Sequence, residues 1–273
     1  MEILRTTDEL RKFRAAVSQK VGFVPTMGAL HAGHISLIKR CKDENEITIV
    51  STFVNPTQFL AGEDLDKYPK NEAADIKICE NLEVDAIFIP KADEFYEDDE
   101  PKISAPKSLS AILEGATRPG HFDGVLQVLN KLFNLTKPKN VYMGKKDAQQ
   151  LTIVRNMVQN FFMDINVNAC EIVRENDGLA LSSRNIYLDE EQKMLALKLS
   201  RSLLKAKNLV DASETDINVI KTAMLKILEP LKVDYIAFVD RNFKEISKIE
   251  VGNSIILVAA YVDKTRLIDN IWL

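Results

Sequence analysis

The stretch Val21-Gly-Phe-Val-Pro-Thr-Met-Gly-Ala-Leu-His-Ala-Gly-His34 joins the signal for a buried strand to the start of a helix. Val21–Val24 is apolar and runs into a turn, and Ile35 to Cys41 opens a helical pattern. His31 and His34 therefore lie where a strand leads into a helix N-terminus. Phosphates bind at that position in many α/β sheets.

The same alternation of strand and helix signals extends over the first 173 residues. Ile47–Val54 is mostly apolar, which is typical of a strand covered on both faces by helices. Further strands are predicted at 85–89, 140–143 and 165–169, and helices at 35–43, 72–82, 122–135 and 148–159. The helix at 122–135 has the clearest apolar stripe, formed by Val125, Val128, Leu129, Leu132 and Phe133. The pattern predicts a doubly wound parallel α/β sheet.

The pattern changes after about residue 173. A long helix is predicted at 189–210, capped by Asp189, and a second at 215–229. Strands are predicted at 233–239, 254–262 and 265–271. We therefore expect two domains, 1–173 and 174–273, the second a smaller α+β domain.

Composition excludes several functional classes. The chain is 46% hydrophobic and 28% charged, as in ordinary globular proteins. A net charge of −4 gives no support for nucleic-acid binding, and no apolar run approaches a membrane span. The N-terminus is too polar for a signal peptide, and the three cysteines are widely spaced without a CxxC pair. We expect a cytoplasmic protein with no nucleic-acid partner, no membrane contact and no protein metal site.

All three histidines fall in two short motifs, one with His31 and His34 and the other with His121. Gly28 and Gly33 allow close approach of the backbone to a ligand. Their spacing mimics half of a P-loop, but the Lys-Ser/Thr of such a loop is missing. We expect the two imidazoles of the first motif to donate hydrogen bonds to phosphate oxygens.

Polar groups also follow the second predicted strand. Asn55 and Gln58 can hydrogen-bond hydroxyls or carboxylates of a small polar substrate, although a simple polar turn is an alternative. A glycine-broken loop, Glu114–Gly124, enters the clearest helix. There His121 or Asp123 could serve only as the helix N-cap.

Two further motifs carry positive charge. Lys145 and Lys146 follow the fourth strand and can face a phosphate, with Asp147 placed to accept from a ribose hydroxyl. Gln150 lies four residues beyond Lys146, on the same side of a helix. At the domain junction, Leu181-Ser-Ser-Arg184 offers two hydroxyls and an arginine for a phosphate clamp. Taken singly, each motif could be a solvated lysine pair or a polar linker.

These five motifs, in this order, closely resemble the pantothenate synthetase (pantoate–β-alanine ligase) family. The matching segments are Met27–His34, Phe53–Phe59, Glu114–Gly124, Gly144–Gln150 and Leu181–Arg184. The first is similar to the HxGH signature of adenylyl-transferring enzymes, and the last to the second signature loop of class I aminoacyl-tRNA synthetases. The family's lysine motif usually reads Gly-Glu-Lys-Asp-Phe-Gln-Gln, so Lys145 and Ala148 depart from it.

The resemblance implies a cytoplasmic homodimer with a Rossmann-like N-terminal domain that binds ATP and pantoate, and a smaller C-terminal lid. It implies a reaction that requires ATP and Mg²⁺. Pantoate attacks the α-phosphorus of ATP, which gives pantoyl adenylate and pyrophosphate. The amine of β-alanine then attacks the acyl carbon, which gives pantothenate and AMP.

The resemblance also implies roles for individual residues. The implied ATP-binding residues are Met27, Gly28, Ala29, Leu30, His31, Ala32, Gly33, His34, Gly144, Lys145, Lys146, Asp147, Val173, Leu181, Ser182, Ser183 and Arg184. The implied catalytic residues are His31, His34, Lys146, Ser182, Ser183 and Arg184, with His34 as a proton donor. Asn55, Gln58 and Gln150 are implied to bind pantoate or β-alanine.

Two other interpretations fit parts of the sequence. The HxGH element also permits an adenylyltransferase that joins a different acid and amine. A non-catalytic nucleotide-binding or RNA-binding relative would share the fold, but the negative net charge disfavours it.

Overall fold

A computed structural model describes residues 1–273, which divide into two compact units, Met1–Glu171 and Ile172–Leu273. The boundary expected from the sequence, after residue 173, lies two residues further along the chain. Each unit has its own sheet and is described by itself.

The first unit is built on a six-stranded sheet in which every strand pair is parallel. Its strands are β1 (Glu2–Leu4), β2 (Val21–Thr26), β3 (Ile47–Thr52), β4 (Ala86–Phe88), β5 (Asn140–Gly144) and β6 (Asn166–Cys170). They lie in the order β1-β4-β3-β2-β5-β6. The predicted fold class, a doubly wound, Rossmann-like sheet followed by a smaller α+β part, is confirmed.

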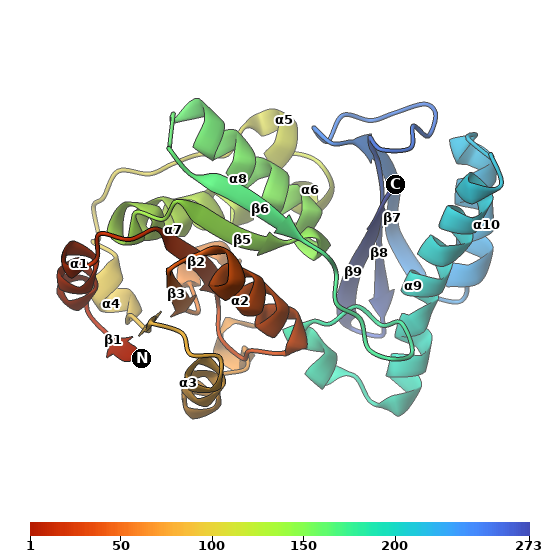
Figure 1. Cartoon of the computed structure of the whole chain (residues 1–273). Coiled ribbons are helices and arrows are strands. Elements are labelled where there is room, and N and C mark those ends of the chain that lie inside the picture. The colour runs from red at the N-terminus through yellow and green to blue at the C-terminus, as the bar shows by residue number, and fades with distance from the viewer. The chain divides into compact units, whose positions relative to one another are not determined.

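Helices cover both faces of this sheet (Figure 1). The helices of this unit are α1 (Thr7–Ala16), α2 (Ala32–Glu44), α3 (Glu72–Asn81), α4 (Ala92–Phe95), α5 (Lys107–Ser110), α6 (Leu113–Thr117), α7 (His121–Thr136) and α8 (Ala148–Asn160). Consecutive residues of β2 face opposite sides, as pleating requires. Phe23 meets Phe133 of α7 edge to face, with ring centroids 6.4 Å apart, and Val24 packs in the cluster that contains Ile38 of α2.

The strand order reverses between β2 and β5. From β2 the chain continues through α2 to β3 on one side, and from β5 it continues through α8 to β6 on the other. Ligands of open α/β sheets bind at the carboxyl ends of the strands at such a reversal. The first histidine motif leaves the carboxyl end of β2, and the lysine motif leaves that of β5.

Helix α7 carries the predicted apolar stripe, and all five of its residues are buried. The helix begins at His121, after Gly120 in the left-handed conformation (φ 85°). The expectation that His121 or Asp123 caps it is therefore wrong. The Asp123 carboxylate instead accepts a hydrogen bond from the backbone of Ala105, at 2.7 Å. His121 is buried, and its Nδ1 lies 2.8 Å from the backbone carbonyl oxygen of Gln58.

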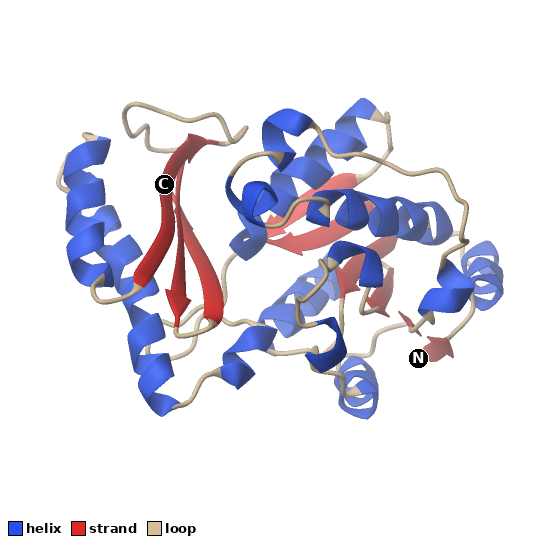
Figure 2. Cartoon of the chain, turned by 180° about the vertical axis from the view of Figure 1, so that it is seen from behind, coloured by secondary structure: helices blue, strands red, loops and turns tan.

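The second unit packs two helices on a three-stranded antiparallel sheet (Figure 2). Its elements are α9 (Glu190–Asp211), α10 (Ile217–Leu228), β7 (Lys232–Asp240), β8 (Ser254–Val262) and β9 (Thr265–Trp272). Asp189 caps α9 in a reciprocal capping box with Gln192, as the sequence predicted for Asp189. In neither unit is any helix both long enough and apolar enough to cross a bilayer.

Replacing Gly124 by Ala is expected to separate α7 from the short 3₁₀ helix η1 (Pro56–Gln58). An added Cβ would lie 2.2 Å from the carbonyl oxygen of Thr57, which is backbone and cannot rotate away. Overpacking of this kind costs about 1–3 kcal/mol. Urea denaturation should show that loss in the free energy of unfolding, whereas Asn134→Ala on the exposed side of α7 should change it by less than about 0.5 kcal/mol.

Candidate active site

The two histidines of the first motif cap α2 in a reciprocal arrangement. Nδ1 of His31 accepts the backbone N–H of Gly33 at 3.1 Å, and Nδ1 of His34 accepts the backbone N–H of His31 at 3.4 Å. The ring centroids lie 4.1 Å apart. Because each Nδ1 accepts a hydrogen bond, the proton of each neutral ring is on Nε2. Both imidazoles therefore keep one N–H donor for a ligand.

A buried carboxylate holds the glycine turn before these histidines. Asp75 on α3 accepts the backbone N–H groups of Ala29 and Leu30, at 2.9 and 2.7 Å. The turn places Gly28 (φ +84°) and Ala29 (φ 50°) in the left-handed region. The hydroxyl of Thr26 takes the N–H of Gly28, at 3.2 Å. The turn thus uses three successive backbone donors internally, which differs from a P-loop, where such donors face a phosphate.

Electrostatics connect the histidine motif with the lysine motif. Burial, then the charge of neighbouring His31, lowers the pKa of His34 to about 3. Burial also lowers the pKa of His31, and the positive charge of Lys146 adds to that shift. Asp147 acts in the opposite direction on both pKa values. The two motifs are therefore close in space, and both imidazoles are neutral at physiological pH.

The lysine motif forms a 3₁₀ turn, η3 (Lys145–Asp147), between β5 and α8. The Nζ of Lys146 lies 3.6 Å from Asp147 Oδ1, and Lys145 forms an ion pair with Glu171. Ala148 begins α8 and is buried, and Gln150 is half-buried in the first turn of that helix.

The motif after β3 joins the same region. Gln58 is buried, and its Nε2 lies 3.0 Å from Sδ of Met27, the residue after β2. Asn55 is also buried and contacts Gln58 through their side-chain amides, at 3.1 Å. The structure therefore brings together residues of the histidine, glutamine and lysine motifs within the first unit.

The remaining predicted residues lie on the second unit. The backbone N–H of Leu181 donates to the carbonyl of Val173 at 3.1 Å, and Ser182 Oγ accepts the N–H of Arg184 at 3.3 Å. These residues share one loop, which an isolated bridge between Arg174 and Ala180 closes.

The loop is anchored to the sheet of its own unit. Arg174 forms a two-pronged ion pair with buried Asp269 of β9, with N–O distances of 2.6 and 2.9 Å. The predicted phosphate clamp therefore rests on a fixed support within the second unit.

Sequence reasoning missed three residues that shape the first unit's site: Asp75, Glu63 and Tyr96. Glu63 pairs with Arg118 through two contacts of 2.6 and 2.7 Å, and Tyr96 donates to Asn55 at 2.7 Å. None of the three lies in a recognisable motif. A single sequence gives no signal that separates them from ordinary surface residues.

We expect the low pKa of His34 to appear in the pH dependence of stability. The pKa of His34 is near 6.5 in the unfolded chain and about 3 in the folded protein. Between these two pH values, the imidazole is protonated only in the unfolded chain. Falling pH therefore lowers the free energy of unfolding over this window, by up to about 1.4 kcal/mol per pH unit. His34→Asn keeps an acceptor for the helix cap and removes the titration.

The measurement is the free energy of unfolding of wild type and His34→Asn, by urea denaturation from pH 7 to pH 4.5. As pH falls, the free energy of unfolding of the wild type should decrease more than that of the variant. Curves that stay parallel over this range would show that His34 titrates normally.

Comparisons with known proteins identify relatives over the whole chain. The family model for pantoate-beta-alanine ligase matches residues 2–272. The chain is 67% identical to the pantothenate synthetase of Campylobacter concisus and 63% identical to that of Campylobacter fetus, over the full length of each. It is 50% identical to a pantothenate synthetase of Helicobacter pylori, again over the full length of both chains.

Solved structures give the same result. A pantothenate synthetase from Thermus thermophilus is 39% identical, with a TM-score of 0.94 over 99% of both chains. A pantoate-beta-alanine ligase from Francisella tularensis, complexed with beta-gamma ATP and beta-alanine, is 37% identical with a TM-score of 0.83, covering 100% of this chain and 97% of the other. From the ordered motifs, the fold and these matches, the chain belongs to the pantoate–β-alanine ligase, or pantothenate synthetase, family.

Proposed function

We propose that the protein condenses pantoate with β-alanine at the expense of ATP, through a pantoyl-adenylate intermediate, with release of pyrophosphate and AMP. The observation that carries the proposal is the convergence of the histidine, glutamine and lysine motifs at the strand-order reversal of a chain from this family. In the first step a pantoate carboxylate oxygen bonds to the α-phosphorus, and the bond from that phosphorus to pyrophosphate breaks. In the second step the β-alanine nitrogen bonds to the acyl carbon, AMP leaves, and the nitrogen loses a proton.

In this proposal the first unit binds the phosphates through side chains. Nε2–H of His31 and of His34 donate to phosphate oxygens, and Lys146 stabilises the negative charge that develops at the α-phosphate. Support comes from the occupied Nδ1 atoms, which leave Nε2 as the donor of each ring. The proton-donor role that the resemblance implies for His34 would require the negative charge of bound phosphates to raise its pKa from about 3.

The other assignments rest on the family resemblance. Ser182, Ser183 and Arg184 hold the outgoing pyrophosphate. Asp147, with the backbone at Gly144 and Val173, holds the nucleoside. The second unit acts as a lid, and by excluding water it protects the acyl adenylate from hydrolysis.

We also propose that Mg²⁺ enters with ATP, that the protein is a homodimer, and that it works in the cytoplasm. The structure brings together no group of three histidine, cysteine or acidic side chains that could hold a metal ion. Magnesium in nucleotide enzymes is held by substrate phosphates, water and one or two carboxylates, so MgATP can bind without a cage of protein ligands.

The test of the reaction is AMP formation from MgATP in four mixtures, with pantoate and β-alanine each present or omitted. AMP should require pantoate, and sustained turnover should require β-alanine as well. If folded protein makes no AMP in any mixture, the proposed reaction is wrong. A pyrophosphate-exchange assay with a panel of acids would then test the alternative of a different acid substrate.

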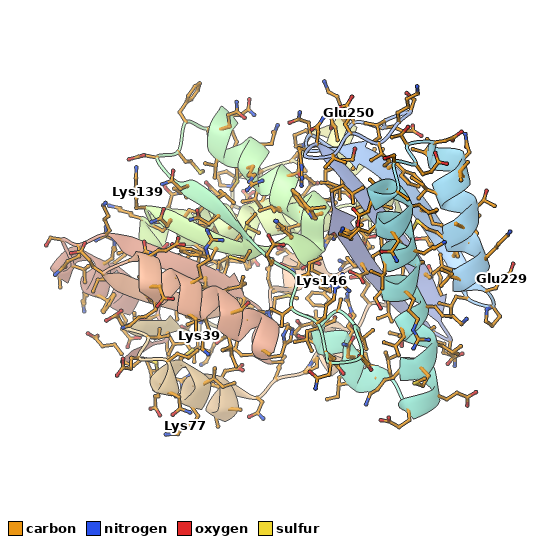
Figure 3. The ribbon with its side chains drawn as sticks, turned by 45° about the vertical axis from the view of Figure 1, so that its right-hand side comes forward. Lys39, Lys77, Lys139, Lys146, Glu229 and Glu250 are labelled. Carbon is orange, nitrogen blue, oxygen red and sulfur yellow. The ribbon has the colours of Figure 1, made fainter.

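Lys146→Ala should lower kcat/KM for pantoate-dependent pyrophosphate exchange by about 100-fold or more, because charge stabilisation in a transition state is worth several kcal/mol. Lys139→Ala is the matched control. Lys139 forms an ion pair with Asp164 and directly precedes β5, whereas Lys146 follows that strand. The two lysines, both labelled in Figure 3, therefore lie at opposite ends of β5. The control should retain activity within about twofold, and a loss below threefold in Lys146→Ala would remove Lys146 from the mechanism.

A further inference from the structure

We propose that Tyr96 and Asn55 are positioning residues that fix the orientation of the Gln58 amide, so that its N–H groups face the acid substrate. The inference rests on the proposed function, because it concerns how the same site recognises pantoate. It starts from a chain of hydrogen bonds that runs from Tyr96 through Asn55 to Gln58.

Three donors converge on one atom of the Asn55 amide. Oδ1 accepts the hydroxyl of Tyr96 at 2.7 Å, the hydroxyl of Thr57 at 3.0 Å and the backbone N–H of Thr57 at 3.3 Å. A backbone N–H can only donate, so the atom that faces it must be the amide oxygen. The orientation of the Asn55 side chain is therefore determined by its neighbours.

The other side of the Asn55 amide leads to the same conclusion. Nδ2 donates to the backbone carbonyl of Gly124 at 3.2 Å and to Oε1 of Gln58 at 3.1 Å. A carbonyl can only accept, so the atom beside Gly124 must be the nitrogen. Both N–H groups of Asn55 are thus used within the protein, and Gln58 must turn its oxygen toward them.

Gln58 therefore directs its Nε2 away from Asn55. Nε2 points toward Sδ of Met27, at 3.0 Å. A thioether is only a weak acceptor, so a carboxylate or hydroxyl oxygen of a ligand would be a better partner for the same N–H groups. The residue is therefore set to recognise an oxygen that accepts hydrogen bonds, and a ligand with only a donor there would leave the buried amide unpaired.

The backbone of Gln58 is held independently. Its carbonyl oxygen accepts from Nδ1 of His121 at 2.8 Å and from Nη2 of Arg118 at 3.2 Å. Nη1 of Arg118 lies 3.0 Å from Nε2 of His121, which must accept because a guanidinium only donates. The doubly bonded pair with Glu63 holds Arg118 in turn. The segment 114–124, which joins α6 to the start of α7, thus supports Gln58.

Tyr96 is held in place by contacts of its ring, at the start of this series of hydrogen bonds. Its ring packs edge to face on Phe95, with centroids 5.2 Å apart, and Nζ of Lys131 lies 4.6 Å from its ring centroid. Burial raises the pKa of its hydroxyl to about 12, so it remains a donor over the whole working range of pH. Removing only this oxygen leaves the ring contacts in place and takes away the shortest of the three hydrogen bonds that hold Oδ1 of Asn55.

The experiment compares Tyr96→Phe with Tyr142→Phe in steady-state kinetics. Tyr142 is a matched control, since it is fully buried and its hydroxyl bonds to Glu44 and Asn45 instead of the site. Tyr96→Phe should raise KM for pantoate about five- to tenfold, the usual effect of one neutral hydrogen bond, with kcat and KM for ATP within about twofold. Tyr142→Phe should leave KM for pantoate unchanged.

Two outcomes would contradict the inference while leaving the proposed reaction intact: an unchanged KM for pantoate in Tyr96→Phe, or a rise in KM for β-alanine alone. Failure of the wild type to make pantothenate would instead contradict the proposed reaction.

A second measurement does not depend on turnover or on the folding of Tyr96→Phe. The side-chain NH₂ signals of Gln58, assigned by their loss in Gln58→Glu, are followed by NMR in the wild type. Pantoate without ATP should shift them, because the substrate replaces the methionine sulfur as acceptor. Signals that stay unmoved at saturating pantoate would overturn the donor role of Gln58.

Discussion

The pairing of β2 with β5 is the constraint on which the rest of the structure depends. Gly22 and Phe23 lie in parallel register with Asn140 and Val141, although the two strands are more than a hundred residues apart in the chain. Because parallel strands end on the same edge of a sheet, this register places two loops with polar side chains side by side. The histidine pair comes from one loop and Lys146 from the other. Neither loop alone would make a site.

Around that edge, buried polar groups satisfy one another before any ligand arrives. Asp75 fixes the glycine turn, and Asn55 fixes the Gln58 side chain. Arg118 and His121 hold the Gln58 backbone. Such networks are costly when incomplete, because an unpaired group in a low-dielectric interior loses its hydration without compensation. Complete ones hold side chains in one orientation, and orientation is what adenylyl transfer mostly requires from a protein.

Elements and motifs that depend on residues close together in the chain could be predicted from the sequence. The apolar run at Val21–Val24 and the stripe on α7 predicted their elements, and the order of the polar motifs predicted the family. The residues missed depend on distant contacts: Asp75 meets a turn 45 positions earlier in the chain, and Tyr96 meets Asn55 41 positions earlier. The strand β1 was also missed, since it has three residues and buries only Leu4. Local sequence patterns give no information about contacts between residues so far apart in the chain.

The turn at Gly28 and Ala29 has a consequence for the cost of binding. Its amides are bonded to Asp75 and Thr26 within the protein, so no ligand is needed to hold the turn in shape. The conformational entropy of ordering this segment is therefore lost when the chain folds, and binding does not have to supply it again. In the proposed mechanism the phosphates are held by imidazole and ammonium groups instead of by the main chain. They can therefore leave after the reaction while the glycine turn keeps its bonds to Asp75 and Thr26.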